Sequence, residues 1–166
     1  MLECACGTGL LSGVIAKHCK QLLATDFSEK MLRRAEKKYG RLGNVRFEKA
    51  DILHLNYPDE SFDVVVAANV IHLLDKPSQA LAELDRVCRG DGRIIIPTYM
   101  NRSETGKVGG VSGAIDRVGA NLKHKFTPDA YRRFFEAAGY ANARYTRCEG
   151  RIPCVVALIQ KPANQD

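Results

Sequence analysis

The sequence predicts an α/β protein with a Rossmann-like, doubly wound sheet in three α/β/α layers. Strand-like segments alternate five times with segments of helical apolar periodicity, a pattern typical of a parallel sheet with helices on both faces. The last two strands have only a short connection, which predicts an antiparallel C-terminal strand in a mostly parallel sheet. The chain has 166 residues, of which 45% are hydrophobic, so we expect a single domain over 1–166.

The first half of the chain predicts three strands and two helices. Apolar residues at 10, 11, 14 and 15 have the spacing of one helix face. Ser28 has a side chain suited to capping the start of the next helix. The expected elements are a strand at 1–4, a glycine loop at 6–9, a helix over about 9–19, a strand at 21–25, a helix after Ser28 and a strand at 44–50.

The second half continues the alternation. The segment 62–68 (FDVVVAA) is almost wholly apolar, as a central strand covered on both faces would be. Pro77 suits the first turn of a helix, and Gly90 is a stop signal. The remaining expected elements are a helix from Pro77 to Gly90, a strand at 93–97, an irregular glycine-rich segment at 99–126, a helix after Thr127 that ends at Gly139, and strands at 143–148 and 153–160.

Composition excludes several classes of protein. No apolar run reaches the roughly 20 residues that span a bilayer, and no signal-peptide pattern opens the chain. We therefore expect a cytoplasmic protein. The six cysteines are scattered rather than arranged as a disulfide framework or a zinc site, and we expect no bound metal.

The net charge of +6 is unevenly distributed. Residues 1–98 carry 14 basic and 13 acidic side chains, whereas residues 99–151 carry 10 basic and 5 acidic ones. A basic segment is suited to an anionic partner, although solubility alone also explains it.

Polar residues follow the predicted strands at the edge where ligands bind in doubly wound sheets. The glycine loop at 6–9 lets a ligand approach the backbone, and the helix after it supplies free N–H groups. Asp26 ends the second strand, where a carboxylate can accept hydrogen bonds from a ribose diol. Asp51 follows the third strand, where it can accept from an adenine amine. Both aspartates could equally be turn or cap residues.

Two kinds of cofactor fit a glycine loop followed by a ribose-binding acid: a dinucleotide and S-adenosylmethionine. Gly7, Gly9 and Gly13 are spaced one residue too widely for the dinucleotide fingerprint. Glu3 lies just before the loop, where its charge would repel a pyrophosphate but suit an ammonium and a sulfonium. These two observations favour S-adenosylmethionine.

Five segments, in order along 2–97, resemble the class I S-adenosylmethionine-dependent methyltransferases of the type 11-like, small-molecule-methylating kind. Residues 2–9 (LECACGTG) resemble motif I of that family. Residues 24–32 resemble its ribose segment, and residues 49–52 resemble its adenine segment. Residues 62–72 resemble its fourth strand and the following turn, and residues 86–96 resemble a helix end and the fifth strand.

The resemblance implies transfer of the S-adenosylmethionine methyl group, by in-line displacement, to a small-molecule acceptor that is anionic or lipid-like, with S-adenosylhomocysteine as the product. The implied cofactor-binding residues are Glu3, Ala5, Gly7, Thr8, Gly9, Asp26, Phe27, Met31, Asp51, Ile52 and Asn69. His72 is a candidate base, with a structural histidine as the alternative, and Tyr99 lies where the acceptor should bind.

The resemblance also sets expectations about the acceptor. Family members usually carry an N-terminal lid segment, which we expect to be missing here, giving a more open pocket. We expect 99–126 to recognise the acceptor. Its basic residues are Arg102, Lys107, Arg117, Lys123, His124 and Lys125. Nucleic acid is disfavoured, because the segment lacks interleaved aromatic residues. A non-catalytic protein that binds an adenosyl ligand or a partner, and an NAD(P)-dependent oxidoreductase, remain the alternatives.

Overall fold

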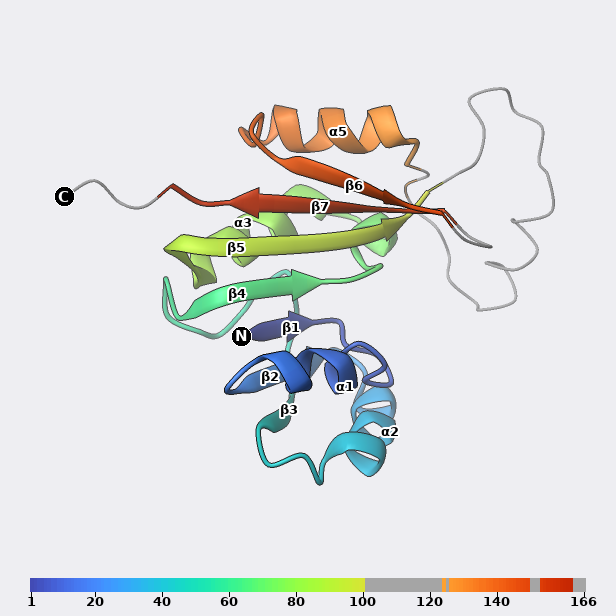
Figure 1. Ribbon diagram of the computed structural model, residues 1–166, viewed down its shortest axis with the longest axis vertical. Coiled ribbons are helices and arrows are strands. Elements are labelled where there is room, and N and C mark those ends of the chain that lie inside the picture. Colours follow the sequence, from blue (N-terminus) through green and yellow to red (C-terminus); the bar gives the residue numbers. More distant parts are fainter. Residues whose placement is uncertain (101–123, 125, 150–152, 163–166) are drawn as a thin grey trace.

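A seven-stranded sheet with the order β3-β2-β1-β4-β5-β7-β6 organises the chain (Figure 1). The computed structural model describes residues 1–100, 124, 126–149 and 153–162. Neighbouring strands from β3 to β5 run parallel, and β7 runs antiparallel to both β5 and β6. The predicted fold class, including the antiparallel C-terminal strand, is confirmed.

The strands match the expected segments closely, apart from β5. They are β1 (Leu2–Cys4), β2 (Leu22–Asp26), β3 (Val45–Lys49), β4 (Phe62–Ala67), β5 (Cys88–Tyr99), β6 (Arg144–Cys148) and β7 (Cys154–Gln160). The helices are α1 (Ser12–Ile15), η1 (Ala16–His18), α2 (Glu29–Tyr39), η2 (Ile71–Leu73), α3 (Pro77–Val87) and α5 (Pro128–Ala137). Within the described residues, no helix is both long and apolar enough to cross a membrane.

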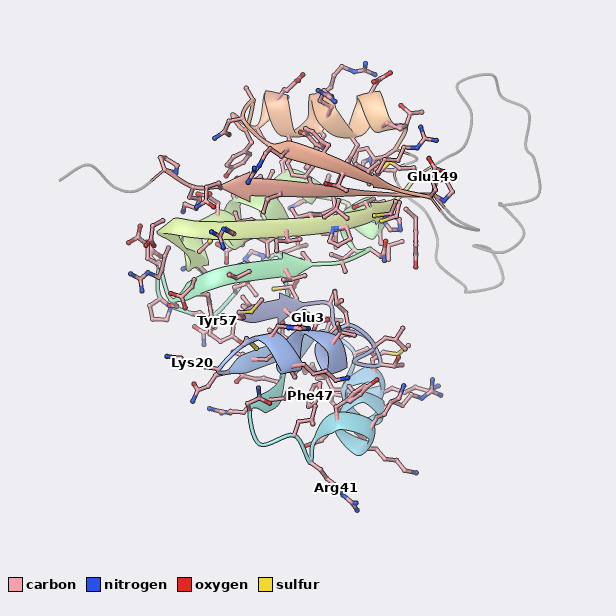
Figure 2. All side chains as sticks on the ribbon, in the orientation of Figure 1. Glu3, Lys20, Arg41, Phe47, Tyr57 and Glu149 are labelled. Atoms are coloured by element: carbon pink, nitrogen blue, oxygen red, sulfur yellow. The ribbon has the colours of Figure 1, made fainter. Side chains whose placement is uncertain are left out.

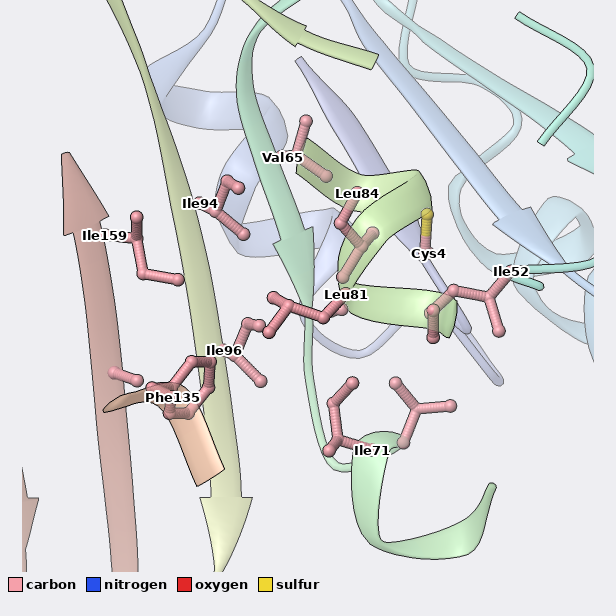
Figure 3. Close-up of a cluster of buried hydrophobic side chains, with 14 of the residues drawn as sticks. Cys4, Ile52, Val65, Ile71, Leu81, Leu84, Ile94, Ile96, Phe135 and Ile159 are labelled. Carbon is pink, nitrogen blue, oxygen red and sulfur yellow. The ribbon is translucent and has the colours of Figure 1, made fainter. Parts of the chain in front are cut away.

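The helices form layers on the two faces of the sheet. On one face, α3 and α5 enclose the larger core, in which Leu81, Leu84 and Phe135 pack against Ile94 and Ile96 of β5 (Figure 3). On the other face, a smaller core joins Ala16 of η1 and Leu32 of α2 to the strands β2 and β3. These layers confirm the α/β/α arrangement.

The expected helix over 9–19 is wrong in its extent. Regular α-helix begins only at Ser12, and a 3-10 turn replaces it from Ala16 onward. Two glycines explain the late start and the short length, because glycine is a poor helix former and Gly9 has a φ of 75° that no helix allows. The apolar residues of this segment have helical spacing, but its glycines have a low propensity for helix.

The expected strand at 93–97 is too short. β5 begins at Cys88, directly after α3, and its register against β4 jumps from the pair Phe62–Cys88 to the pair Val64–Arg93. The extra residues form an irregularity in the strand where a turn was expected. Gly92 is required there, because a Cβ atom would lie 2.8 Å from the Asp63 carbonyl oxygen.

The predicted Ser28 cap is confirmed, and Thr127 caps the last helix in the same way. The Ser28 hydroxyl accepts a hydrogen bond from the Met31 amide at the start of α2, and the Thr127 hydroxyl accepts one from the Ala130 amide at the start of α5. Each cap satisfies an amide that has no partner inside its helix. The Ser28 cap also fixes the direction in which the chain leaves Asp26.

Candidate functional site

The strand order reverses at β1, which pairs with β2 along one edge and with β4 along the other. In doubly wound sheets, a crevice opens at the carboxyl ends of the strands at such a point. The segments that leave those ends are 5–9 after β1, 27–28 after β2 and 68–70 after β4. The topology therefore brings most of the predicted site residues to the end of the sheet where the parallel strands have their carboxyl ends.

The glycine loop after β1 has an unusual backbone. Ala5, Gly7 and Gly9 all have positive φ values, of 55°, 56° and 75°. A Cβ atom at Gly7 would meet no atom within 4 Å, so the space over this residue is open. A Cβ atom at Gly9 would lie 3.0 Å from both Ala35 and Tyr39 of α2. One glycine thus faces open space and the other allows the loop to pack on a helix.

Asp26 ties the glycine loop to the start of α2. Its Oδ2 atom accepts a hydrogen bond of 2.8 Å from the Gly7 amide, and its Oδ1 atom accepts one of 2.8 Å from the Ser28 amide. An ionised carboxylate can accept about four hydrogen bonds, so each oxygen has capacity for one more. Asp26 can therefore hold the loop and bind ligand hydroxyl groups at the same time.

Glu3 lies behind the loop rather than in the open part of the site. Its side chain is 1% exposed, between β1 and α1 (Figure 2), and the Ser12 hydroxyl donates a hydrogen bond of 2.5 Å to its Oε2 atom. Burial raises the pKa of the Glu3 carboxyl to about 7; the Ser12 hydrogen bond opposes this rise, and the negative charge of Asp26 adds to it. The carboxyl group therefore links β1 to α1 instead of facing the open part of the site.

Asp51 and Ile52 follow β3, next to the end of β2. The Ala50 amide donates to the Asp26 carbonyl oxygen, which fixes this segment beside the ribose-binding candidate. The Asp51 Oδ1 atom accepts a hydrogen bond of 2.9 Å from the Leu53 amide, leaving further capacity on the carboxylate. The Ile52 side chain is buried in the larger core, so little of its surface is open to a ligand.

Asn69 joins the ends of β4 and β5. Its φ is 53°, a conformation that asparagine tolerates better than most residues. The Asn69 backbone amide donates a hydrogen bond to the Pro97 carbonyl oxygen, and the side-chain Oδ1 atom accepts one of 3.1 Å from the Tyr99 backbone amide. Tyr99, a candidate catalytic residue, has an exposed side chain at the end of β5. The structure therefore brings Asn69 and Tyr99 together.

His72, the other candidate catalytic residue, lies in η2 and is 4% exposed. Its Nδ1 atom has no hydrogen-bond partner among the described residues. Burial lowers the pKa of the imidazole, which is therefore neutral at physiological pH. A neutral imidazole can accept a proton, but this ring lies in the packed interior.

The other predicted residues are spread along the rim. Phe27 is 69% exposed beside Asp26, while Met31 and Thr8 are half-buried. Of the basic residues expected to recognise the acceptor, His124 is described, and its amide donates to the His72 carbonyl oxygen. The others lie outside the described residues, namely Arg102, Lys107, Arg117, Lys123 and Lys125.

The cysteines beside the loop are protonated thiols. Burial raises the pKa of Cys4 and of Cys6 to about 12, so neither is a thiolate at neutral pH. Among the residues that the structure describes, no three histidine, cysteine, aspartate or glutamate side chains form a group that would hold a metal ion.

Two residues that support the site were not predicted from the sequence. Ser12 holds the buried Glu3 carboxyl, and the Tyr39 ring fills the space beside Gly9 and Gly13. A Cβ atom at Gly13 would lie 2.4 Å from the Tyr39 ring, which gives this glycine a packing role. The sequence held one usable signal, the glycines at 9 and 13, whose missing side chains leave room for a neighbouring element.

The residues present fit an adenosyl cofactor. Gly7 leaves open space at the loop, Asp26 has free acceptor capacity beside it, and Asp51 lies one strand further along. This arrangement, at the switch point of a doubly wound sheet, is the one in which Rossmann-like proteins bind nucleotides. A family model described as a methyltransferase domain matches residues 2–96, which is more than half of the chain. The chain belongs to the class I S-adenosylmethionine-dependent methyltransferase family.

Named relatives agree with this assignment. The chain is 33% identical over 120 residues to a phosphatidylethanolamine N-methyltransferase of Cereibacter sphaeroides, covering 70% of this chain and 58% of that protein. It is 35% identical over 96 residues to a demethylmenaquinone methyltransferase of Clavibacter sepedonicus, covering 58% and 39%. The chain thus spans less than two thirds of the length of either relative.

A solved structure shares the fold. The structure of a SAM-dependent methyltransferase from Aquifex aeolicus superposes with a TM-score of 0.71, covering 95% of this chain and 80% of that one. At 23% identity, this likeness supports the architecture alone.

Proposed function

We propose that the protein transfers the methyl group of S-adenosylmethionine to a small, lipid-like acceptor. The observation that carries the proposal is the hydrogen bonding of Asp26, which holds the open Gly7 loop while keeping acceptor capacity for a ribose diol. The lipid and quinone relatives support an acceptor with a large apolar part.

The residues have distinct tasks in this proposal. Asp26 binds the ribose hydroxyls, Asp51 accepts from the adenine amine, and Phe27 covers the adenine from its exposed position. Asn69 holds the ends of β4 and β5 together at the methyl-transfer side. When bound, the cofactor supplies an activated methyl group and its own leaving group. The protein therefore contributes mainly by aligning the acceptor and excluding water.

Cofactor binding is tested by calorimetric titration with S-adenosylmethionine. Replacing Asp26 with alanine removes a charged hydrogen-bond acceptor and should weaken binding by roughly 1.5–3 kcal/mol. Asp26→Asn is the gentler variant, because its amide oxygen still accepts one of the two backbone bonds. Asp63→Ala is the matched control, since Asp63 is exposed at the start of β4, at the opposite end of that strand. Unchanged affinity in both Asp26 variants would remove Asp26 from the site.

Turnover is tested with methyl-labelled cofactor and two acceptors, phosphatidylethanolamine vesicles and a demethylated quinone. We expect label in the lipid extract and S-adenosylhomocysteine in the aqueous phase. Tight cofactor binding with no label in any acceptor, including a general metabolite extract, would instead support a non-catalytic adenosyl-binding protein.

A further inference from the structure

Cys148 and Cys154 lie directly opposite each other in the sheet. Cys148 is the last residue of β6, Cys154 is the first residue of β7, and the antiparallel register of the two strands pairs them. Residues paired in this way have Cα atoms about 4.5–5.5 Å apart, which lies within the range of about 4.4–6.8 Å that a disulfide spans. The backbone therefore already provides the separation that a disulfide between these residues needs.

Both cysteine side chains project from the same face of the sheet. On β6, the Tyr145 ring packs against the Phe135 ring of α5, and on β7, Val155 is buried in the larger core on that side. Because successive side chains of a strand alternate between the two faces, Cys148 and Cys154 both point to the other face. The two sulfur atoms are therefore not separated by the sheet.

The two thiols differ in exposure and lie close enough to interact. Cys148 is exposed, whereas Cys154 is half-buried. Burial raises the pKa of the Cys154 thiol, a hydrogen bond with the Thr98 backbone opposes this rise, and a negative charge on Cys148 adds to it. The last effect requires the two sulfur atoms to be near each other. The exposed Cys148 thiol is the one that a dissolved oxidant reaches first.

The other cysteines lack this arrangement. Within the described strands, no other pair of opposed residues consists of two cysteines. Cys4, Cys6 and Cys88 are buried, and Cys19 is half-buried at the end of η1, outside the sheet. Register and access together therefore distinguish one pair among the six cysteines.

The pair lies in the same row of the sheet as Tyr99. β7 runs between β5 and β6, and Cys154 is opposite Tyr99 on one side and Cys148 on the other (Figure 1). The Thr98 hydroxyl donates a hydrogen bond to the Tyr131 hydroxyl of α5, so Tyr99 projects from the same face as the two cysteines. The cysteine pair is thus next to the candidate acceptor residue at the end of β5.

We propose that Cys148 and Cys154 are a reversible oxidation site, which forms a disulfide on reaction with a low-molecular-weight disulfide. The Cys148 thiolate attacks one sulfur atom of the oxidant, which forms a mixed disulfide and releases one thiolate. The Cys154 thiolate then attacks the Cys148 sulfur atom, which forms the internal disulfide and releases the second thiolate. The two cysteines lose two electrons, the oxidant gains them, and the two thiol protons pass to the released thiolates. The site goes beyond the proposed function and stands without it.

Trypsin gives a direct test, because it cleaves after Arg147 and Arg151 and so places the two cysteines on separate peptides. The reduced protein is incubated with oxidised glutathione at about pH 8, where an ordinary thiol is partly ionised. Free thiols are then blocked with iodoacetamide before digestion. Mass spectrometry should detect the two peptides joined, with a mass lower by two hydrogen atoms than their sum. Dithiothreitol added before the blocking step should remove the joined species.

Serine variants separate the two chemical steps. In Cys154→Ser the first step occurs but the second cannot, so a glutathione adduct should accumulate on Cys148 to at least about tenfold its level in the parent protein. In Cys148→Ser the joined peptides should be absent. Cys19→Ser is the matched control, since Cys19 is also half-buried but lies outside the sheet, and it should give the joined peptides in the parent yield.

Four outcomes would overturn the proposal. The first is that Cys148 and Cys154 stay free in the oxidised parent, which decides the matter without any variant. The second is a comparable yield of peptides that join either cysteine to Cys19. The third, detected on a nonreducing gel, is a dimer of two copies joined through Cys148 in place of the internal bond. The fourth is an equal amount of glutathione adduct in the parent and in Cys154→Ser.

Discussion

The buried carboxyl of Glu3 should make the stability of the protein depend on pH in a specific window. Its pKa is about 7 in the folded protein against an ordinary value of 4.5, chiefly because burial disfavours the charged form. Between these two values the folded state holds a proton that the unfolded state has released, so stability falls as pH rises, by about 1.4 kcal/mol per pH unit. The full loss is about 3 kcal/mol, complete above about pH 7 and absent below about pH 4.5.

The variant Glu3→Gln removes this titration while keeping an oxygen that accepts the Ser12 hydrogen bond. Urea unfolding at a series of pH values from 4 to 8 gives the free energy of unfolding for both proteins. We expect Glu3→Gln to be more stable than the parent by about 3 kcal/mol at pH 8, relative to their difference at pH 4. Asp63→Asn, at an exposed carboxylate, is the control and should change the pH dependence little.

Identical pH profiles for the parent and Glu3→Gln would refute the reasoning, since they would show that the Glu3 carboxyl is not desolvated.

The titration of Glu3 should also affect cofactor binding. If the ammonium of the cofactor binds near this carboxyl, it favours the charged form, and binding near pH 7 should release a proton. Calorimetry in two buffers with different ionisation enthalpies measures that release, which should disappear in Glu3→Gln.

Two further predictions concern packing around the site. Gly13→Ala should lower the free energy of unfolding in a urea titration by about 1–3 kcal/mol, because its Cβ atom would lie 2.4 Å from the Tyr39 ring. Gly43→Ala is the control: its Cβ atom would have no other atom within 4 Å, so the free energy of unfolding should change by less than about 0.5 kcal/mol. Arg86→Lys should lower it by about 1–3 kcal/mol, because the guanidinium donates to two carbonyls of the loop before β4, at 2.7 Å each, as well as to Glu83. Arg89→Lys, at an exposed ion pair, should have little effect, and equal losses at both arginines would contradict the assigned role of Arg86.

Much of the fold could be predicted because local patterns and global packing agree. The apolar run at 62–68 forms β4, whose last three residues are buried, and Ser28 caps the helix that follows it as expected. The errors occurred where backbone conformation overrode the side-chain pattern. Gly9 and Gly13 shortened the first helix, and the irregular register of β5 absorbed a segment that reads as a turn.

The site was predictable in its position and less so in its contacts. Sheet topology places the carboxyl ends of β1, β2 and β4 next to one another, so the residues that follow these strands lie close together. The sequence could not show that Glu3 is turned away from the open space or that Ile52 lies in the core. The direction of a side chain after a strand depends on the dihedral angles of a few loop residues, and those angles depend on tertiary hydrogen bonds such as the one from Gly7 to Asp26.

Two non-glycine residues in the left-handed region flank the point where the strand order reverses. Ala5 follows β1 with a φ of 55°, and Asn69 follows β4 with a φ of 53°. Asparagine tolerates this conformation, but alanine does so at a cost of about 1–2 kcal/mol. The fold holds both turns with tertiary bonds, from the Cys6 amide to Thr25 and from Asn69 to Pro97 and Tyr99. Backbone strain persists only where the surroundings enforce it. Among the described residues, Glu60 in the turn before β4 is the third non-glycine residue with such a value, whereas Ala5 and Asn69 lie on the two sides of the point where the strand order reverses, as turns shaped for a ligand would.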